Sequence, residues 1–231
     1  MKTIGLIGGM SWESSLEYYR LVNELVKARL GGLHSAKCLM YSVDFAEIEE
    51  YQRQGEWLEA GKVLAAAAQS LERGGAECVA LCTNTMHKVA AEIEVAVSIP
   101  LLHIADPTAR KIQAAGLGRV GLLGTRFTME EDFYRERLVK RFGLQVLIPE
   151  KPQREVVHRV IYDELILGII RAESRLVYRQ IIRNLVNQGA EGIILGCTEI
   201  GMLVKPADSP VALFDTTVLH AEAAVEFALI K

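Results

Sequence analysis

The sequence repeats itself once at long range, and this repeat constrains the fold more than any other feature. Residues 5–8 (GLIG) are echoed by residues 121–124 (GLLG), 116 positions later. Residues 75–85 (GAECVALCTNT) match residues 189–199 (GAEGIILGCTE) at an offset of 114 positions. Two separate matches at nearly equal offsets indicate a duplicated unit, although any two strand-then-helix segments share some likeness.

Short apolar runs alternate with longer amphipathic stretches along the chain. The expected strands are Thr3–Ile7, Ala36–Val43, Cys78–Leu81, Arg119–Leu123, Gln145–Ile148 and Gly192–Leu195. The expected helices are Glu13–Arg29, Gly61–Gly74, Lys88–Glu94, Glu130–Phe142, Arg154–Gly168, Ala172–Gln188 and Leu219–Ile230. This alternation predicts an α/β protein with mostly parallel sheets.

The repeat divides the predicted fold into two halves. We expect two similar, flavodoxin-like α/β half-domains related by pseudo-twofold symmetry, with the active site in the cleft between them. The first half would comprise residues 1–98 plus 208–231, and the second residues 99–207. Ligands of open α/β sheets bind beyond the carboxyl ends of the strands. The residues expected around the shared cleft are Met10, Thr83, Thr125 and Cys197.

Cys197 is the strongest candidate for a catalytic side chain. It follows the apolar run Gly192–Leu195 at the end of an expected strand, near a helix N-terminus. Backbone N–H groups and the helix dipole stabilise a thiolate at such a place. Most free cysteines are instead small buried hydrophobic residues. The polar residues Thr198 and Glu199 follow at once, which favours the functional interpretation.

The repeat aligns Thr83, and not its neighbour Cys82, with Cys197. Strand alternation turns Cys82 away from the direction in which Thr83 points, so Cys82 is expected to pack against the sheet. Asn84 and Thr85 offer donors suited to a carboxylate, or they cap the next helix. His87 lies about one turn further on, where we expect it to cap and pack.

Composition excludes several classes of function. The net charge of −3 gives no reason to expect nucleic acid or an anionic membrane as a partner. The four cysteines have no metal-binding spacing, and we interpret them as reduced thiols of a cytoplasmic protein. Arg53 and Arg126 are candidate cations for an acidic substrate, but the sequence does not place either of them in the site.

Three motifs resemble those of the aspartate/glutamate racemase family, and the similarity covers the whole chain. They are residues 8–11 (GGMS), 84–87 (NTMH) and 196–199 (GCTE). The resemblance implies a homodimer that binds an amino acid and uses no cofactor. It further implies that two cysteines move the α-proton, one on each side of the substrate. The residues that it implies around the substrate are Met10, Gln52, Asn84, Thr85, Thr198 and Glu199.

The chain departs from this pattern at Thr83, which stands where the family has its first cysteine. A threonine hydroxyl is too weak an acid to serve as a base at neutral pH, although it can relay a proton. The resemblance therefore implies a racemase that deprotonates L-aspartate or L-glutamate at Cys197 and works poorly on the D-forms. A broad-specificity racemase, a single-cysteine decarboxylase or isomerase, and a binding protein without turnover remain alternatives.

Overall fold

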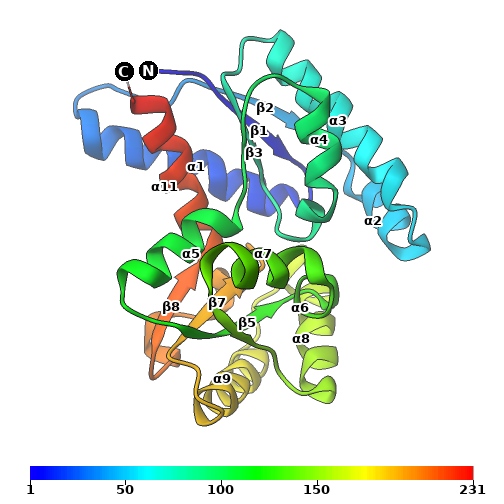
Figure 1. Ribbon diagram of the computed structural model, residues 1–231, viewed down its shortest axis with the longest axis vertical. Helices are drawn as coiled ribbons and strands as arrows, with labels where there is room; N and C mark the ends of the chain where they lie inside the picture. The colour runs from blue at the N-terminus through cyan, green and yellow to red at the C-terminus, as the bar shows by residue number, and fades with distance from the viewer. Residues whose placement is uncertain (231) are drawn as a thin grey trace. The chain divides into compact units, whose positions relative to one another are not determined.

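A computed structural model describes residues 1–230 of the chain. The chain forms two compact units, each built on a four-stranded parallel sheet (Figure 1). The first unit comprises residues 1–104 and the chain from His220 onward, and the second comprises residues 105–219. The boundaries therefore lie at 104/105 and 219/220, not at 98/99 and 207/208 as the sequence suggested.

The first unit contains one sheet with strand order β2-β1-β3-β4. Its elements are β1 (Ile4–Gly8), α1 (Trp12–Leu30), β2 (Cys38–Ser42), α2 (Phe45–Gln54), α3 (Trp57–Arg73), β3 (Cys78–Leu81), the 3-10 turn η1 (Thr85–Val89), α4 (Ala90–Ala96) and β4 (Leu101–Leu102). Helix α3 packs across β1, β2 and β3. Its buried face, which includes Leu64 and Leu71, closes the core over Ile7 and Leu81.

The second unit repeats this strand order as β6-β5-β7-β8. Its elements are α5 (Ala105–Ala114), β5 (Arg119–Gly124), α6 (Arg126–Glu130), α7 (Asp132–Phe142), β6 (Gln145–Leu147), α8 (Lys151–Asp163), η2 (Leu165–Leu167), α9 (Ala172–Asn187), β7 (Gly192–Gly196), α10 (Ile200–Leu203), η3 (Pro206–Asp208) and β8 (Ala212–Asp215). Helix α11 (Thr216–Leu229) begins in this unit and continues in the first.

All six strands expected from the sequence are present, and two further strands complete the sheets. Both additional strands are short edge strands, β4 with two residues and β8 with four. The two residues of β4 are too few to show a period. Strand β8 is as long as the predicted strand β3, so its length does not explain why it was missed. Strand β8 pairs with β7 in parallel, so residues 208–219, which we expected in the first half, belong to the second unit.

The strand order explains where each unit can hold a ligand. In the flavodoxin-like order 2-1-3-4, the connections leave the two central strands in opposite directions, which opens a crevice at their carboxyl ends. The central strands are β1 and β3 in the first unit and β5 and β7 in the second. Met10 and Thr83 follow the first pair, and Thr125 and Cys197 follow the second.

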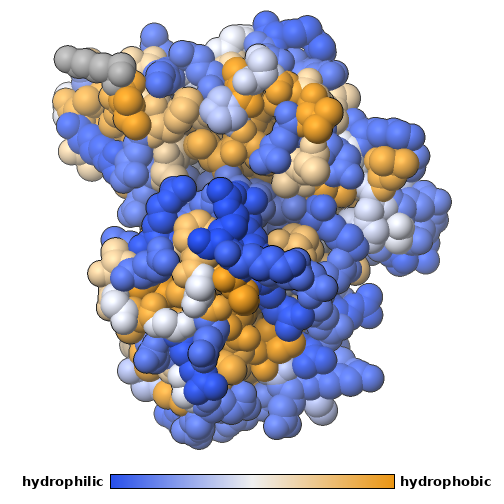
Figure 2. Space-filling model, in the orientation of Figure 1, coloured by the Kyte–Doolittle hydropathy of each residue, from blue (hydrophilic) through white to orange (hydrophobic). Residues whose placement is uncertain are grey.

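The exposed surface mixes hydrophilic residues with apolar patches. On the face drawn in Figure 2, hydrophilic residues surround apolar patches on each unit. Among residues 1–230, no helix is both long enough and apolar enough to cross a membrane.

Candidate functional site

The turn after β1 is set by glycine and serine. Gly9 has a φ of +96°, and a Cβ there would lie 2.2 Å from the carbonyl oxygen of Val43, so only glycine fits. The Gly9 N–H donates to Ser15 Oγ over 2.7 Å, and Ser11 caps α1 by accepting from the Ser14 N–H. These bonds hold Met10, which is 5% exposed, at the carboxyl end of β1.

The turn after β3 separates Cys82 from Thr83. The Thr83 N–H donates to the Leu81 carbonyl over 2.8 Å, which closes a tight turn centred on Cys82. Cys82 is fully buried, and burial raises the pKa of its thiol well above the usual value. A thiol in this environment stays protonated at neutral pH. Cys82 therefore packs in the core of the first unit as a neutral thiol.

Asn84 and Thr85 follow this turn directly, and Gln52 of α2 contacts Met86, the residue after Thr85. Asn84 precedes η1 without capping it through its side chain, so N-capping does not explain this residue. The Gln52 amide on α2 donates to the sulfur of Met86 over 2.9 Å, which places α2 against η1. All three polar side chains are at most 5% exposed. In the first unit, Met10 and residues 83–85 follow the ends of β1 and β3, and Gln52 contacts Met86 of the adjacent turn η1.

In the second unit, two glycines allow the ends of β5 and β7 to approach closely. Gly124 pairs with Gly196, and a Cβ on Gly124 would lie 2.8 Å from the Gly196 carbonyl oxygen. Thr125 and Cys197 follow these two glycines directly, so their segments are neighbours. The hydroxyl of Thr125 caps α6 by accepting from the Thr128 N–H over 3.3 Å. Thr125 thus has a structural role here.

Cys197 and Glu199 form a hydrogen-bonded pair. The Cys197 thiol donates to Glu199 Oε2 across 3.0 Å, and the Thr198 hydroxyl donates to the same oxygen across 2.5 Å. All three residues are at most 8% exposed. One carboxylate oxygen of Glu199 therefore accepts two hydrogen bonds, from the thiol of Cys197 and the hydroxyl of Thr198, and lies within reach of the thiol proton.

The pKa of the Cys197 thiol is shifted upward, whereas the sequence predicted an environment that stabilises the thiolate. Burial raises the pKa of its thiol well above 9, and the charge and hydrogen bond of Glu199 raise it further. The N–H groups of Glu199 and Ile200 oppose this shift without reversing it. The helix that follows, α10, has only four residues, which is too short for a full helix dipole. Without substrate, Cys197 is thus a neutral thiol and not the expected thiolate.

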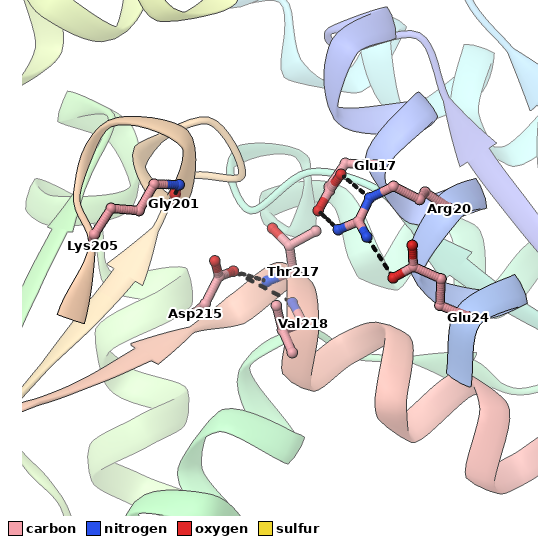
Figure 3. A network of polar contacts seen from close by, with 8 residues as sticks. All are labelled: Glu17, Arg20, Glu24, Gly201, Lys205, Asp215, Thr217 and Val218. Carbon is pink, nitrogen blue, oxygen red and sulfur yellow. Dashed lines mark hydrogen bonds and ion pairs between the residues drawn. The ribbon is translucent and has the colours of Figure 1, made fainter. Parts of the chain in front are cut away.

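Helix α10, which follows Cys197, lies close to Asp215 at the end of β8. The Asp215 carboxylate accepts from the N–H groups of Thr217 and Val218 at 2.9 and 3.3 Å, which caps the start of α11 (Figure 3). A Cβ on Gly201 would lie 2.2 Å from Asp215 Oδ2, so α10 can approach this carboxylate only with glycine there. The Thr216 hydroxyl also donates to the Leu195 carbonyl over 2.9 Å.

Asp208 lies at the end of the segment that runs from Cys197 to residue 208, and it is held by several polar contacts. Its carboxylate accepts from Arg175 Nε over 2.7 Å and from the Lys205 N–H over 2.8 Å, and Arg179 lies 3.7 Å away. The side chain of Asp208 is 4% exposed. Asp208 thus fixes the end of this segment through two hydrogen bonds from residues at positions 175 and 205.

The two arginines that were candidate substrate cations have different surroundings. Arg53 pairs with Glu50 one helical turn away, and its side chain is 62% exposed. Arg20 on α1 is paired on the surface in the same way with Glu17 and Glu24 (Figure 3). Arg126 is exposed and lies over the ring of Phe127, 5.3 Å from its centroid. Within residues 1–230, no group of three or more His, Cys, Asp or Glu side chains could hold a metal ion.

Sequence reasoning missed the pairing of Cys197 with Glu199, which it treated as a residue that contacts substrate. The spacing of two residues carried the signal, because a carboxylate so close to a cysteine is within reach of its sulfur. The contacts of Gly201 with Asp215 and of Asp208 with Arg175 had no such local signal. They join positions 14 and 33 residues apart, which only the fold brings together.

Comparison with known proteins shows that the sequence matches one protein family over most of its length. Residues 7–224 match the model of the Asp/Glu/hydantoin racemases. A Yersinia pestis protein assigned to the Asp/Glu racemases has a crystal structure with 56% identity over all of both chains and a TM-score of 0.93. An aspartate racemase homologue from Pyrococcus horikoshii has 36% identity, coverage of 99% of each chain and a TM-score of 0.85.

Among curated proteins, the broad specificity amino-acid racemase RacX of Bacillus subtilis is 26% identical over 171 residues. The match spans 71% of this chain and 70% of that protein. The family model covers nearly the whole duplicated fold, including the ends of all four central strands. The chain is therefore an enzyme of the Asp/Glu/hydantoin racemase family.

Proposed function

We propose that this enzyme removes the α-proton of L-aspartate or L-glutamate with Cys197 and returns a proton to the opposite face through Thr83. The observation that carries the proposal is the 3.0 Å hydrogen bond from the Cys197 thiol to Glu199. It pairs a nucleophilic sulfur with a buried proton acceptor at the carboxyl end of a central strand. The proposal requires that the segments at residues 83–85 and 197–199 act on one bound amino acid.

The first step is activation of the thiol. The α-ammonium group of the approaching substrate favours the thiolate form of Cys197, because a nearby cation lowers the pKa of an acid. Glu199 takes the thiol proton, and the thiolate then takes the α-proton of the substrate. The electron pair of the broken C–H bond moves toward the α-carboxylate. Hydrogen-bond donors among Asn84, Thr85 and Thr198 stabilise the negative charge that develops there.

The second step distinguishes the two faces of the substrate. A carbanion-like α-carbon is a strong base, so the hydroxyl of Thr83 is acidic enough to protonate it. The reverse reaction on a D-substrate would need a threonine alkoxide, which is not available at neutral pH. Racemisation has an equilibrium constant of one, so both directions share this slow step. Cys197 then exchanges the α-proton of the L-substrate with solvent faster than the enzyme converts the L-substrate into the D-isomer, because only the conversion needs Thr83.

Proton NMR in D₂O tests this proposal directly. L-Aspartate and L-glutamate should lose their α-proton signal much faster than the D-isomers, with no cofactor added. Cys197→Ala should abolish the exchange. Cys38→Ala, which removes a free thiol from strand β2 outside the site, serves as the control and should leave the exchange unchanged. Equal exchange from both enantiomers, or exchange that persists without Cys197, would contradict the mechanism.

A racemase of broad specificity is the second candidate. Arg53 is paired with Glu50 on the surface, so it does not supply a cation for an acidic side chain in this arrangement. RacX, a relative of the chain, is named for broad specificity. The same exchange measurement on L-alanine, L-leucine, L-lysine and L-methionine separates the candidates, because a broad enzyme exchanges them at rates similar to L-aspartate.

We further propose that the enzyme is a cytoplasmic homodimer, as the family resemblance implies. The free thiols Cys38, Cys78, Cys82 and Cys197 suit a reducing compartment. Light scattering after size-exclusion chromatography measures the mass in solution, for which the monomer value is 25.5 kDa. A mass near that value at micromolar concentration would contradict the dimer, and cell fractionation tests the location.

A further inference from the structure

His87 connects the Thr83 turn to a distant part of the first unit. Its imidazole is 3% exposed and lies on η1, directly after the turn. Nδ1 is 2.8 Å from the carbonyl oxygen of Thr83. The Ile104 N–H donates to Nε2 over 3.2 Å. The ring therefore joins the carboxyl end of β3 to the segment that follows β4.

These two partners fix the protonation of the ring. A backbone N–H can only donate, so Nε2 must be unprotonated where it accepts from Ile104. A carbonyl oxygen can only accept, so Nδ1 must carry the proton that it donates to Thr83. Only the neutral imidazole with its proton on Nδ1 satisfies both bonds. The structure thus assigns a single tautomer to His87.

The bond from His87 completes the restraint of the Thr83 backbone. The Thr83 N–H already donates to the Leu81 carbonyl over 2.8 Å, and its carbonyl accepts from His87. Both polar backbone groups of Thr83 are consequently fixed, and they set the direction of its side chain. We propose that His87 is a positioning residue that holds the Thr83 hydroxyl in the place from which it protonates the substrate.

This inference rests on the proposed function, but it predicts an effect on one half-reaction only. Displacing a reacting group by about 1 Å can slow a step by about 100-fold. Loss of the His87 bond should therefore slow inversion, which uses Thr83. It should leave exchange of the L-substrate's α-proton, which uses Cys197, much less affected. A general loss of folding would lower both rates together.

A hydrogen bond of the neighbouring buried histidine His220 provides a matched control. His87 lies 4.4 Å from His103 and 6.0 Å from His220, between ring centroids. His220 Nε2 is 2.6 Å from the Leu102 carbonyl, and its Nδ1 is 2.8 Å from the Tyr18 hydroxyl. Neither of these bonds touches the Thr83 turn. Tyr18→Phe thus removes a buried hydrogen bond of similar kind without releasing Thr83.

Two amide substitutions separate the two bonds of His87. In His87→Asn the amide nitrogen takes the place of Nδ1 and can still donate to the Thr83 carbonyl. In His87→Gln the amide oxygen reaches the place of Nε2 and accepts from Ile104, but the bond to Thr83 is lost. We expect the ratio of inversion to α-exchange to fall about 10- to 100-fold in His87→Gln. The ratio should remain near the wild-type value in His87→Asn and in Tyr18→Phe.

Nitrogen NMR of ¹⁵N-histidine-labelled protein tests the same arrangement without turnover. The expected spectrum has His87 protonated at Nδ1 and unprotonated at Nε2, and His87→Gln should accelerate amide exchange in residues 83–85 above that of Tyr18→Phe. The opposite tautomer, or an unchanged inversion-to-exchange ratio in His87→Gln, would overturn the inference. If the wild-type enzyme exchanges no α-proton, the proposed function fails, while the spectrum still decides the role of His87.

Discussion

The thiol of Cys197 donates to Glu199 Oε2 across 3.0 Å, with both side chains buried at the end of β7. In the mechanism that we propose, this distance lets Glu199 accept the thiol proton as well as contact substrate. Burial and the Glu199 charge both favour the neutral thiol in the absence of substrate. In the proposed mechanism, the thiolate forms when the α-ammonium group of the substrate arrives.

Glu199→Gln should separate the two effects of this carboxylate. Glu199 raises the pKa of the Cys197 thiol, so its removal should shift that pKa downward. The rate of iodoacetamide alkylation against pH measures the shift, with Cys197→Ala as the blank. Exchange of L-substrate should nevertheless fall about 10²- to 10⁴-fold, because the variant lacks the proton acceptor. An alkylation profile displaced to higher pH would contradict this interpretation.

Thr83→Cys should give the enzyme a base on the second face. A thiol ionises far more readily than a hydroxyl, so exchange of D-aspartate or D-glutamate should rise by about 10²-fold or more. Thr83→Ser keeps a hydroxyl at the same position and should show no gain. Proton NMR in D₂O measures both variants, and a D-exchange rate equal in the two would exclude Thr83 from proton transfer.

Gly201→Ala should destabilise the second unit. The new Cβ would lie 2.2 Å from Asp215 Oδ2, and overpacking of this kind costs about 1–3 kcal/mol of unfolding free energy. Because Asp215 caps α11 beside the Cys197 segment, L-substrate exchange should fall as well. Gly118→Ala is the matched control, since a Cβ there meets nothing within 4 Å. Urea titration of both variants measures the difference, and equal stability would show that the contact relaxes freely.

Asp208 should make stability depend on acid pH. Burial alone would raise its pKa, but the hydrogen bond from Arg175, the Lys205 N–H and the two arginine charges together hold that pKa below its usual value. A lowered folded-state pKa contributes stability above the unfolded value of about 3.9, and this contribution is lost as pH falls through the folded value.

Asp208→Asn should therefore lower the unfolding free energy at pH 7 by about 1–3 kcal/mol. It should also lose less stability than the wild type between about pH 5 and pH 2. Glu136→Gln serves as the control, because Glu136 pairs with Lys140 on the surface with 47% of its side chain exposed. Thermal unfolding at a series of pH values measures all three proteins. Parallel pH profiles for wild type and Asp208→Asn would contradict the assignment.

The sequence was sufficient for the repeat, for six of the eight strands and for the alignment of Thr83 with Cys197. Local patterns carry this information, because strand periodicity and strand-end motifs are written in consecutive residues. The edge strand β4 was missed because two residues show no pattern, and the edge strand β8 was missed although it is as long as β3. The unit boundary at Leu219 was missed together with β8, because it depends on the pairing of β8 with β7, which no local pattern records.

The sequence by itself determined the family, the parallel α/β units and the residue types at the ends of their central strands. Only the tertiary structure decided the burial, the protonation and the hydrogen-bond partners of those residues. It buried Cys197 beside Glu199 and so made the thiol neutral, it turned Cys82 into the core, and it fixed His87 between Thr83 and Ile104. The physical reason is that pKa values and tautomers depend on burial and on partners distant in the chain, which no local pattern records.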